Sequence, residues 1–340
     1  MKKLNLAFVF VLAISLVLTL GCQTSYAAEY ELRLGHVENT SSVVHKTAVE
    51  FKDLVEERTN GEVKVTIFPN SQLGSGTEQV KMVQTGSLNM GIIPAGHMGS
   101  VFAEIQIFDI PFLLPDNLDD ANKVINGPAA DKMFSYLEDK NLHGVANFAL
   151  GLKQYTANKA IRTPADFKGL KFRTMASPLI IESFKLLDAN PTVVDYHELY
   201  TALQLGQVVG HENPYWGIGR MKFHEVQDYV IESNHGLYTN TLLASNKWFN
   251  NLPSDIQKII NESGKEVTEV AWSGIQKEDK EYKETIIEDP NTELIVLTSE
   301  ERSQFREVLE PVKDLYVERL GESGKEILDA FVEASEKYRE

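Results

Sequence analysis

The segment from Gly169 to Pro214 constrains the fold most, because its apolar residues switch repeatedly between strand and helix periods. In Gly169-Leu170-Lys171-Phe172-Arg173 apolar and basic residues alternate, which is typical of a strand with one buried face. This alternation of elements predicts an α/β layer with a mostly parallel sheet. The later elements are a helix over 178–187, a strand at 193–194, a helix over 197–205 that ends at Gly206, and a strand that begins at Val208.

Arg173 and Asn213 both stand at the ends of predicted strands. The alternation turns Arg173 away from the core, and ligands of such sheets bind at the carboxyl ends of the strands, so both side chains can face one crevice. A guanidinium matches a carboxylate through two hydrogen bonds, and an Asn amide offers one donor and one acceptor group. The pattern alone leaves two plainer interpretations open, an exposed surface arginine and an asparagine that starts a turn before Pro214.

The first part of the chain shows a similar alternation. Its apolar residues predict a second β-α-β-α-β layer. The expected elements are a strand over 30–35, a helix over 41–58, a strand over 63–68, a helix over 76–85 and a strand over 90–93.

Residues 1–28 predict a cleaved export signal. Lys2 and Lys3 precede an apolar run over 4–20, and Ser25-Tyr26-Ala27 supplies the small residues of a cleavage site. Leu20-Gly21-Cys22 also resembles the end of a lipoprotein cleavage box, which leaves a lipid anchor at Cys22 as an alternative. Because Cys22 is the only cysteine, no disulfide can form within one chain. We therefore expect an exported, periplasmic protein.

The composition is that of a globular protein, and 340 residues allow about two domains. A formal charge of −16 argues against nucleic acid and anionic lipid surfaces as partners. An acidic ligand is still compatible with this charge, because salt screens diffuse surface charge beyond about 10 Å while a desolvated arginine acts at short range. We expect a local positive pocket inside a negative shell.

Motifs for catalysis and cofactors are missing from the sequence. Three His-Glu pairs, at 197–198, 211–212 and 224–225, lack the second histidine of a zinc helix. The sequence has no phosphate-binding glycine loop and no Gly-x-Ser-x-Gly. Carboxylate pairs are expected by chance in a chain with 49 acidic residues, so they are weak evidence for a glycosidase. We expect neither a cofactor, nor a bound metal, nor an enzyme.

Several short pieces, in the same order, resemble one family, the extracytoplasmic solute-binding proteins of tripartite ATP-independent periplasmic (TRAP) transporters of the C4-dicarboxylate-binding (DctP) type. The resemblance covers nearly the whole chain after the signal and is weakest after about Asp289. The pieces are FPNSQLG at 68–74, TGSL at 85–88, IPFL at 110–113, QYTANK at 154–159, TPADFKGLKFR at 163–173, ELYTALQ at 198–204 and GHENP at 210–214.

The resemblance implies a two-lobe, periplasmic-binding-protein-like (Venus flytrap) fold that closes on its ligand. Lobe one would comprise 29–150 plus 239–278, and lobe two 151–238 plus 279–335. The run from Pro253 to Ile287 fits a long helix that bridges the lobes, with Gly264 as its weak spot.

The resemblance further implies that Arg173 and its partner Asn213 bind the ligand. A second basic position of the family, often Arg, maps onto Lys153. A lysine makes a point contact rather than a fork, and a solvated surface lysine is the alternative. The family's aromatic position maps onto Tyr196, which packs either on the ligand or in the core.

Further candidates follow from position alone. Tyr215 and Trp216 follow Pro214 and can wall a pocket, with packing between the lobes as the alternative. The remaining candidates, at predicted strand ends or loops, are His36, Glu38, His97 and His235.

The resemblance implies a monomeric receptor that captures a small organic acid and delivers it to the small and large membrane subunits of a TRAP transporter. Its ligand is a carboxylate or, alternatively, a sulfonate. Two other functions stay open at this point, a binding protein that reports to a sensor kinase or chemoreceptor, and an exported hydrolase.

Overall fold

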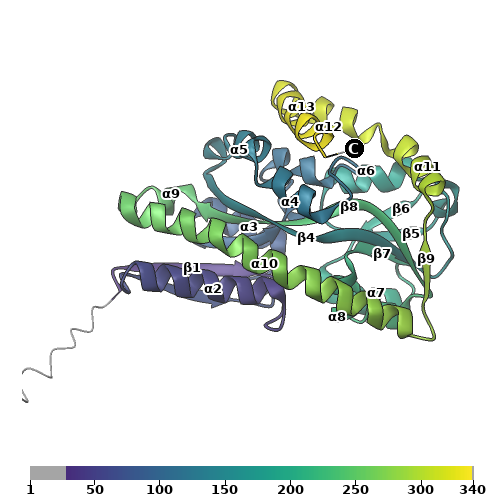
Figure 1. Cartoon of the computed structure of the whole chain (residues 1–340), viewed down its shortest axis with the longest axis horizontal. Helices are drawn as coiled ribbons and strands as arrows, with labels where there is room; N and C mark the ends of the chain where they lie inside the picture. The colour runs from purple at the N-terminus through teal and green to yellow at the C-terminus, as the bar shows by residue number, and fades with distance from the viewer. Residues whose placement is uncertain (1–27, 339–340) are drawn as a thin grey trace, which may run out of the picture.

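Nine strands form a mixed sheet in residues 28–338, the part of the chain that this computed structural model describes (Figure 1). Their order is β2-β1-β3-β8-β4-β7-β5-β6, and β9 pairs with β8. Cys22 and all but the last residue of the predicted export signal lie outside the described residues. The strands are β1 (Tyr30–His36), β2 (Val63–Phe68), β3 (Met90–Pro94), β4 (Leu142–Ala157), β5 (Lys171–Thr174), β6 (Asn190–Val193), β7 (Gly210–Asn213), β8 (Tyr229–Ser245) and β9 (Glu293–Val296).

The sheet has two parallel ends joined by two long strands. β1, β2 and β3 run parallel at one end, and β5, β6 and β7 run parallel at the other. β4 and β8 connect the ends and are antiparallel to each other and to their neighbours β7 and β3. The prediction of a mostly parallel sheet is therefore correct within each end and wrong for β4 and β8, because the chain crosses between the ends as extended strands.

Helices cover the sheet, and their positions follow the predicted apolar stripes. In α2 the buried residues Val44, Ala48, Phe51 and Val55 recur at helical spacing. The α-helices of the first half are α2 (Val43–Arg58), α3 (Gly76–Thr85), α4 (Leu118–Ile125) and α5 (Pro128–Phe134). Those that follow are α6 (Pro178–Leu186), α7 (Leu199–Gln204), α8 (Tyr215–Arg220), α9 (Asn246–Phe249), α10 (Ser254–Glu288), α11 (Ser299–Leu309), α12 (Val312–Leu320) and α13 (Glu322–Glu336). The short 3₁₀ helices are η1 (Ala95–His97), η2 (Ala103–Asp109), η3 (Glu138–Lys140), η4 (Pro164–Phe167), η5 (Tyr196–Glu198) and η6 (Phe223–Val226).

The 35-residue helix α10 crosses both ends of the sheet (Figure 1). It packs against α2 and β4, and further along against α8. Gly264, the predicted weak spot, lies where α10 meets β4 and β8, because a Cβ there would stand 2.3 Å from Val145 and 3.0 Å from Leu242. The glycine is thus explained by close packing of the helix on the sheet.

The C-terminal helices contact both ends of the molecule. α12 packs against α6 and η2, and α13 packs against α4 and α5. The predicted lobe boundaries assign 279–335 to lobe two. These contacts do not test that assignment, so the boundaries remain a prediction. In residues 28–338 no helix combines the length and apolar character that crossing a membrane requires.

Candidate functional site

The carboxyl ends of four strands meet near the middle of the sheet. β3 is antiparallel to β8 and ends where Pro94 pairs with Asn240. β7 is antiparallel to β4 and ends where Asn213 pairs with Gln154, next to the pairing of Lys153 with Gly236. β1 is parallel to β3, and β5 is parallel to β7. The carboxyl ends of β1 and β3 therefore lie on one side of the β8 segment 236–240, and those of β5 and β7 lie on the other side. We call this meeting point of strand ends the seam.

Arg173 lies at the seam near the end of β5 and is only 2% exposed. Its Nε donates a 2.9 Å hydrogen bond to the carbonyl of Val194, and it forms no ion pair with a carboxylate of residues 28–338. Burial lowers the pKa of Arg173, while Tyr238 and Glu212 favour its charged form. Alternation predicted that Arg173 points away from the core of its own layer, and the structure buries this side chain at the seam instead of leaving it on an open surface. Arg173 is therefore a buried cation without a counterion, which is what an anionic ligand would supply.

Two neutral histidines lie close to Arg173. Burial, followed by the charge of Arg173, lowers the pKa of both His97 and His211 to about 3. Asn213, the predicted partner of Arg173, places its Nδ2 3.0 Å from Nδ1 of His211. When that amide donates, neutral His211 carries its proton on Nε2, which is buried and has no partner among the described residues. The seam thus offers a neutral donor beside the Arg173 cation.

Other buried polar atoms around the seam also lack hydrogen-bond partners in the described structure. A buried polar atom left unpaired costs about 1–3 kcal/mol, so a group of them at one place indicates a position that a polar ligand would complete. Tyr196 and His97 line a cavity of about 200 Å³ that is bounded by Val37 from one half and Glu198 from the other. The unpartnered atoms include the Tyr196 hydroxyl, Thr174 Oγ1, both side-chain polar atoms of Asn240, and both carboxylate oxygens of Glu38.

Lys153 and His235 belong to a separate buried network. Lys153 Nζ lies 2.9 Å from Glu212 Oε1 and 3.9 Å from Asp109 Oδ1, and His235 Nε2 lies 2.8 Å from Glu212 Oε2. Burial alone would lower the pKa of Lys153, but Glu212 and Asp109 raise it above its ordinary value. The cavity beside this network measures about 10 Å³, which is room for one water molecule at most. A solvated surface lysine is therefore excluded, and ligand contact by Lys153 or His235 stays a prediction.

Tyr215 and Trp216 pack on opposite sides of the start of α8. The Tyr215 hydroxyl donates to Glu232, and the Trp216 indole N–H donates to the carbonyl of Leu150. The Trp216 ring also meets Tyr238 edge to face at 5.6 Å between centroids. Trp216 therefore contacts the seam through Tyr238. The hydroxyl of Tyr215 already has a hydrogen-bond partner, Glu232, outside the seam.

His36 and Glu38 follow from the end of β1 into the seam. His36 Nε2 lies 3.1 Å from Nδ1 of His45, and burial lowers the pKa of His36 to about 3. Burial raises the pKa of Glu38 to about 7, although Arg220 opposes this shift. The structure thus brings His36, Glu38, His97, Arg173 and Asn213 to the ends of the four converging strands.

Sequence reasoning missed three residues at this place, His211, Tyr238 and Asn240. His211 stands two residues before Asn213, so strand alternation gave a usable signal that both share a face. Tyr238 and Asn240 lie inside the long strand β8, where nothing in the local pattern separates a site residue from the core.

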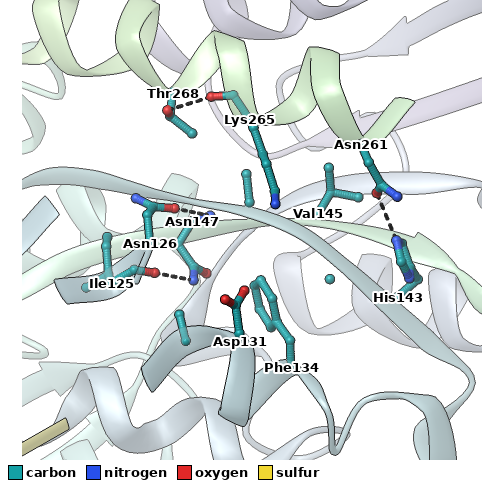
Figure 2. A pocket seen from close by; sticks show the side chains of 13 residues that line it. Ile125, Asn126, Asp131, Phe134, His143, Val145, Asn147, Asn261, Lys265 and Thr268 are labelled. Atoms are coloured by element: carbon teal, nitrogen blue, oxygen red, sulfur yellow. Dashed lines mark hydrogen bonds between the residues drawn. The ribbon is translucent and has the colours of Figure 1, made fainter. Parts of the chain in front are cut away.

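A larger cavity, of about 440 Å³, lies away from the seam between α5, β4 and α10 (Figure 2). Lys265 reaches toward it from α10 and Asp131 from α5 (Figure 2). Its other polar side chains already have hydrogen-bond partners within the fold, as in the 2.9 Å contact of His143 with Asn261. None of the predicted site residues lines it, so volume alone does not identify the functional site. Residues 28–338 contain no group of three or more His, Cys, Asp or Glu that could hold a metal ion.

Comparisons with known proteins identify the family of this chain. The family model for bacterial extracellular solute-binding proteins, family 7 (DctP), matches residues 34–319. The C4-dicarboxylate-binding periplasmic protein DctP of Rhodobacter capsulatus is 34% identical, over 93% of this chain and 94% of its own length.

Solved structures match the fold as well. A TRAP periplasmic solute-binding protein of Desulfovibrio salexigens with bound orotic acid is 35% identical, with a TM-score of 0.87 over 91% of this chain and 99% of that one. One from Shewanella oneidensis with bound succinate is 30% identical, with a TM-score of 0.84 over 91% of this chain and 100% of that one. The predicted two-lobe α/β fold and the family resemblance are thereby confirmed. This chain belongs to the bacterial extracellular solute-binding proteins of family 7, the DctP family of TRAP transporter receptors.

Proposed function

We propose that this protein captures a small organic acid between two lobes and that Arg173 anchors the carboxylate of that acid. The observation that carries the proposal is a buried guanidinium without an ion-pair partner among the described residues, at the point where the strand ends of both halves meet. Leaving such a cation unpaired is costly, and a bound carboxylate removes that cost through a charge-assisted, two-pronged contact.

The ligands of similar proteins support an acid. The protein from Rhodobacter capsulatus is named for C4-dicarboxylates, and the two solved structures hold orotic acid and succinate. All of these ligands carry a carboxylate. Asn213 is proposed as the second contact, with Tyr196, Trp216 and His97 as walls.

The division into lobe one (29–150 plus 239–278) and lobe two (151–238 plus 279–335) is part of the same proposal. Contacts that cross the seam support a closing motion. Ser177 donates a 2.6 Å hydrogen bond to Asp109, and His197 Nε2 lies 3.2 Å from the carbonyl of Val37. A ligand that touches groups on both sides favours the closed form over the open one.

Delivery to membrane subunits follows from the family. We propose one small and one large multispanning subunit, a monomeric receptor, and an export signal over residues 1–28 that is removed or exchanged for a lipid anchor at Cys22. The receptor releases its acid unchanged, so catalytic turnover of a bound acid would contradict the proposal.

A thermal-shift screen of the purified protein against carboxylates, sulfonates and neutral sugars tests this function. A ligand at about 100 times its dissociation constant adds about 2.7 kcal/mol of stability, which gives a clear rise in melting temperature. We expect shifts with carboxylates that disappear in Arg173→Ala. A shift with neutral sugars alone would overturn Arg173 as the anchor, and a sulfonate preference would replace the carboxylate.

A further inference from the structure

Glu38 is a buried carboxylate whose side chain has no hydrogen-bond partner in the described part of the chain. The residue is 1% exposed, and both side-chain oxygens lack a hydrogen-bond partner among residues 28–338. Only its backbone is engaged, since its carbonyl accepts a 2.8 Å hydrogen bond from the N–H of Asn70. A carboxylate in this state requires either a proton or a donor from outside the chain.

Register places Glu38 at the seam. His36, two residues earlier, pairs with Ile92 of β3, and Ile92 pairs with Leu242 of β8. Glu38 therefore extends beyond the end of β1 to about the level where Pro94 pairs with Asn240.

Tyr196 and Tyr238 lie near both the Glu38 carboxylate and the Arg173 guanidinium. Both Glu38 and Arg173 act on the pKa of Tyr196 and on the pKa of Tyr238, after the larger effect of burial. The two tyrosines therefore lie within the fields of the Glu38 carboxylate and the Arg173 guanidinium. The seam therefore holds both a cation and a carboxylate that have no charged partner within hydrogen-bond distance among residues 28–338.

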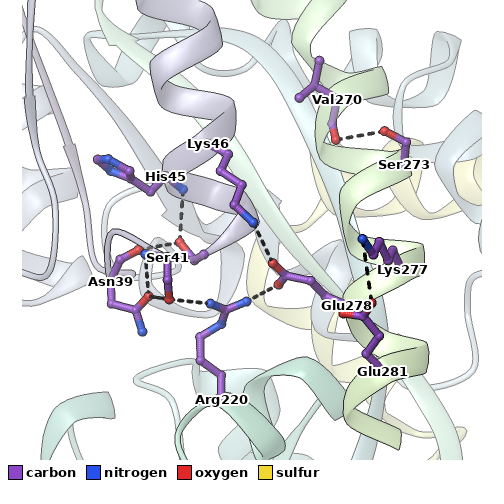
Figure 3. Close-up of polar contacts among 11 residues, drawn as sticks. Asn39, Ser41, His45, Lys46, Arg220, Val270, Ser273, Lys277, Glu278 and Glu281 are labelled. Atoms are coloured by element: carbon purple, nitrogen blue, oxygen red, sulfur yellow. Dashed lines mark hydrogen bonds and ion pairs between the residues drawn. The ribbon is translucent and has the colours of Figure 1, made fainter. Parts of the chain in front are cut away.

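The remaining cations near the seam already have counterions. Lys153 pairs with Glu212. Arg220, which lies near Glu38, pairs with Glu278 of α10 (Figure 3). A second carboxylate on the ligand would thus meet the Glu38 carboxylate without a free cation beside it, whereas a hydroxyl or N–H group would meet an unused acceptor.

We infer that the ligand is a monocarboxylate whose far end carries O–H or N–H donors, and that Glu38 binds these donors and selects against dicarboxylates. This inference rests on the proposed function and narrows its ligand class. Sugar acids, hydroxy acids and acids of N–H heterocycles have the required chemistry, while succinate does not.

Calorimetry with matched probes tests the inference. Succinate and 4-hydroxybutyrate have the same chain length and differ in the far group, and galactonate and orotate add larger donor-bearing monocarboxylates. We expect at least one of the three donor-bearing acids to bind at least tenfold tighter than succinate. Succinate as the tightest ligand would overturn the inference and leave the proposed function standing. If no acid binds, both fall.

A substitution assigns the selectivity to Glu38. Glu38→Gln keeps the shape and removes the charge, so the preference over succinate is expected to shrink at least tenfold. Glu104→Gln is the matched control. Glu104 is also buried, at 6% exposure, and has one unpartnered side-chain oxygen, but the residue whose pKa it raises is Tyr316 of α12 and not a residue of the seam. An unchanged preference in Glu38→Gln, with a normal melting temperature, would overturn the assignment.

The pH dependence of binding gives a second readout that needs no variant. A donor-bearing ligand binds ionised Glu38, so its affinity is expected to rise from pH 5.5 to 8.5, whereas a dicarboxylate held by protonated Glu38 would weaken over that range. Affinity for the donor-bearing acids that falls with pH would contradict the inference. The charged or titratable groups around Glu38 are Arg220, Glu278, Tyr196, Tyr238 and His36.

Discussion

Lys153 and Glu212 form a buried ion pair, with Nζ and Oε1 2.9 Å apart, whereas Arg173 at the seam has no ion-pair partner among residues 28–338. Both pair members are at most 6% exposed in their side chains. The pair therefore completes the fold, whereas we propose that the unpaired cation binds the carboxylate of the ligand.

Glu212→Gln should destabilise the protein by about 3–5 kcal/mol, because it leaves Lys153 buried with only the more distant Asp109 as counterion. Urea denaturation at neutral pH measures this change. Glu182→Gln is the control, since Glu182 pairs with Lys185 on an exposed helix face and should cost no more than about 1 kcal/mol. Equal losses in both variants would mean that the Glu212 pair contributes no more than a surface pair.

Arg173→Ala should weaken binding of the acid by about 2–5 kcal/mol, the scale for truncating one member of a buried charged pair. The same change should not lower stability without ligand, because it removes a buried charge that forms no ion pair with residues 28–338. Calorimetry and urea denaturation give the two quantities. Arg162→Ala, at an exposed ion pair with Glu301, should change neither by more than about 1 kcal/mol. Unchanged affinity in Arg173→Ala would remove Arg173 from the site.

Arg220 joins three elements, and its loss should favour the open form. Nη1 donates a 2.9 Å hydrogen bond to the hydroxyl of Ser41 before α2, and Nη2 pairs with Glu278 of α10 (Figure 3). Because apparent affinity scales with the population of the competent form, Arg220→Gln should weaken binding about tenfold. Small-angle scattering of the ligand-free protein should show a larger radius of gyration.

The neighbouring Lys46 provides the control for Arg220. It also pairs with Glu278, at 3.4 Å, but its side chain is 62% exposed against 6% for Arg220. Lys46→Gln should therefore leave affinity and radius of gyration nearly unchanged. A tenfold loss of affinity in Lys46→Gln as well would mean that any loss of positive charge beside Glu278 of α10 weakens binding, and that the buried contacts of Arg220 are not the cause.

Local pattern predicted the elements well where one period held over the whole segment. The expected bounds of β2 and α3 match the structure, and the predicted bridging helix over 253–287 matches α10 within one residue at each end. Short apolar runs predicted the bounds of elements less accurately. The strand expected at Val193-Val194 starts earlier, at Asn190, and the helix expected from His197 begins as a 3₁₀ turn.

The site was predictable only in part, because its residues come from distant segments. Arg173 and Asn213 were found through the family resemblance and their strand ends. The ion pair joins Lys153 and Glu212, which lie 59 positions apart in sequence on two different strands. No local period in the sequence can reveal such a pair. For the same reason the alternation that turned Arg173 away from its own core carried no information on how deeply the folded protein buries its side chain.

His97 should make stability fall as the pH is lowered. Burial and then the charge of Arg173 lower its folded-state pKa from 6.5 to about 3. Between these two pH values the unfolded chain takes up a proton that the folded protein does not. His97 therefore lowers the free energy of unfolding by up to about 1.4 kcal/mol for each unit by which the pH falls. The stabilising contribution is complete above pH 6.5 and is lost as the pH falls toward 3.

Variants separate this effect from other groups that titrate in the same range. His36 and His211 act in the same direction, while Glu38, with its pKa raised to about 7, acts in the opposite one. The difference in unfolding free energy between the wild type and His97→Asn should therefore change with pH from 6.5 to 4 in urea titrations without ligand, in favour of the variant at low pH. Thr174→Ser, which alters no titratable group, should give a curve parallel to that of the wild type. A parallel curve for His97→Asn would mean that the His97 ring takes up its proton in the folded state as readily as in the unfolded chain.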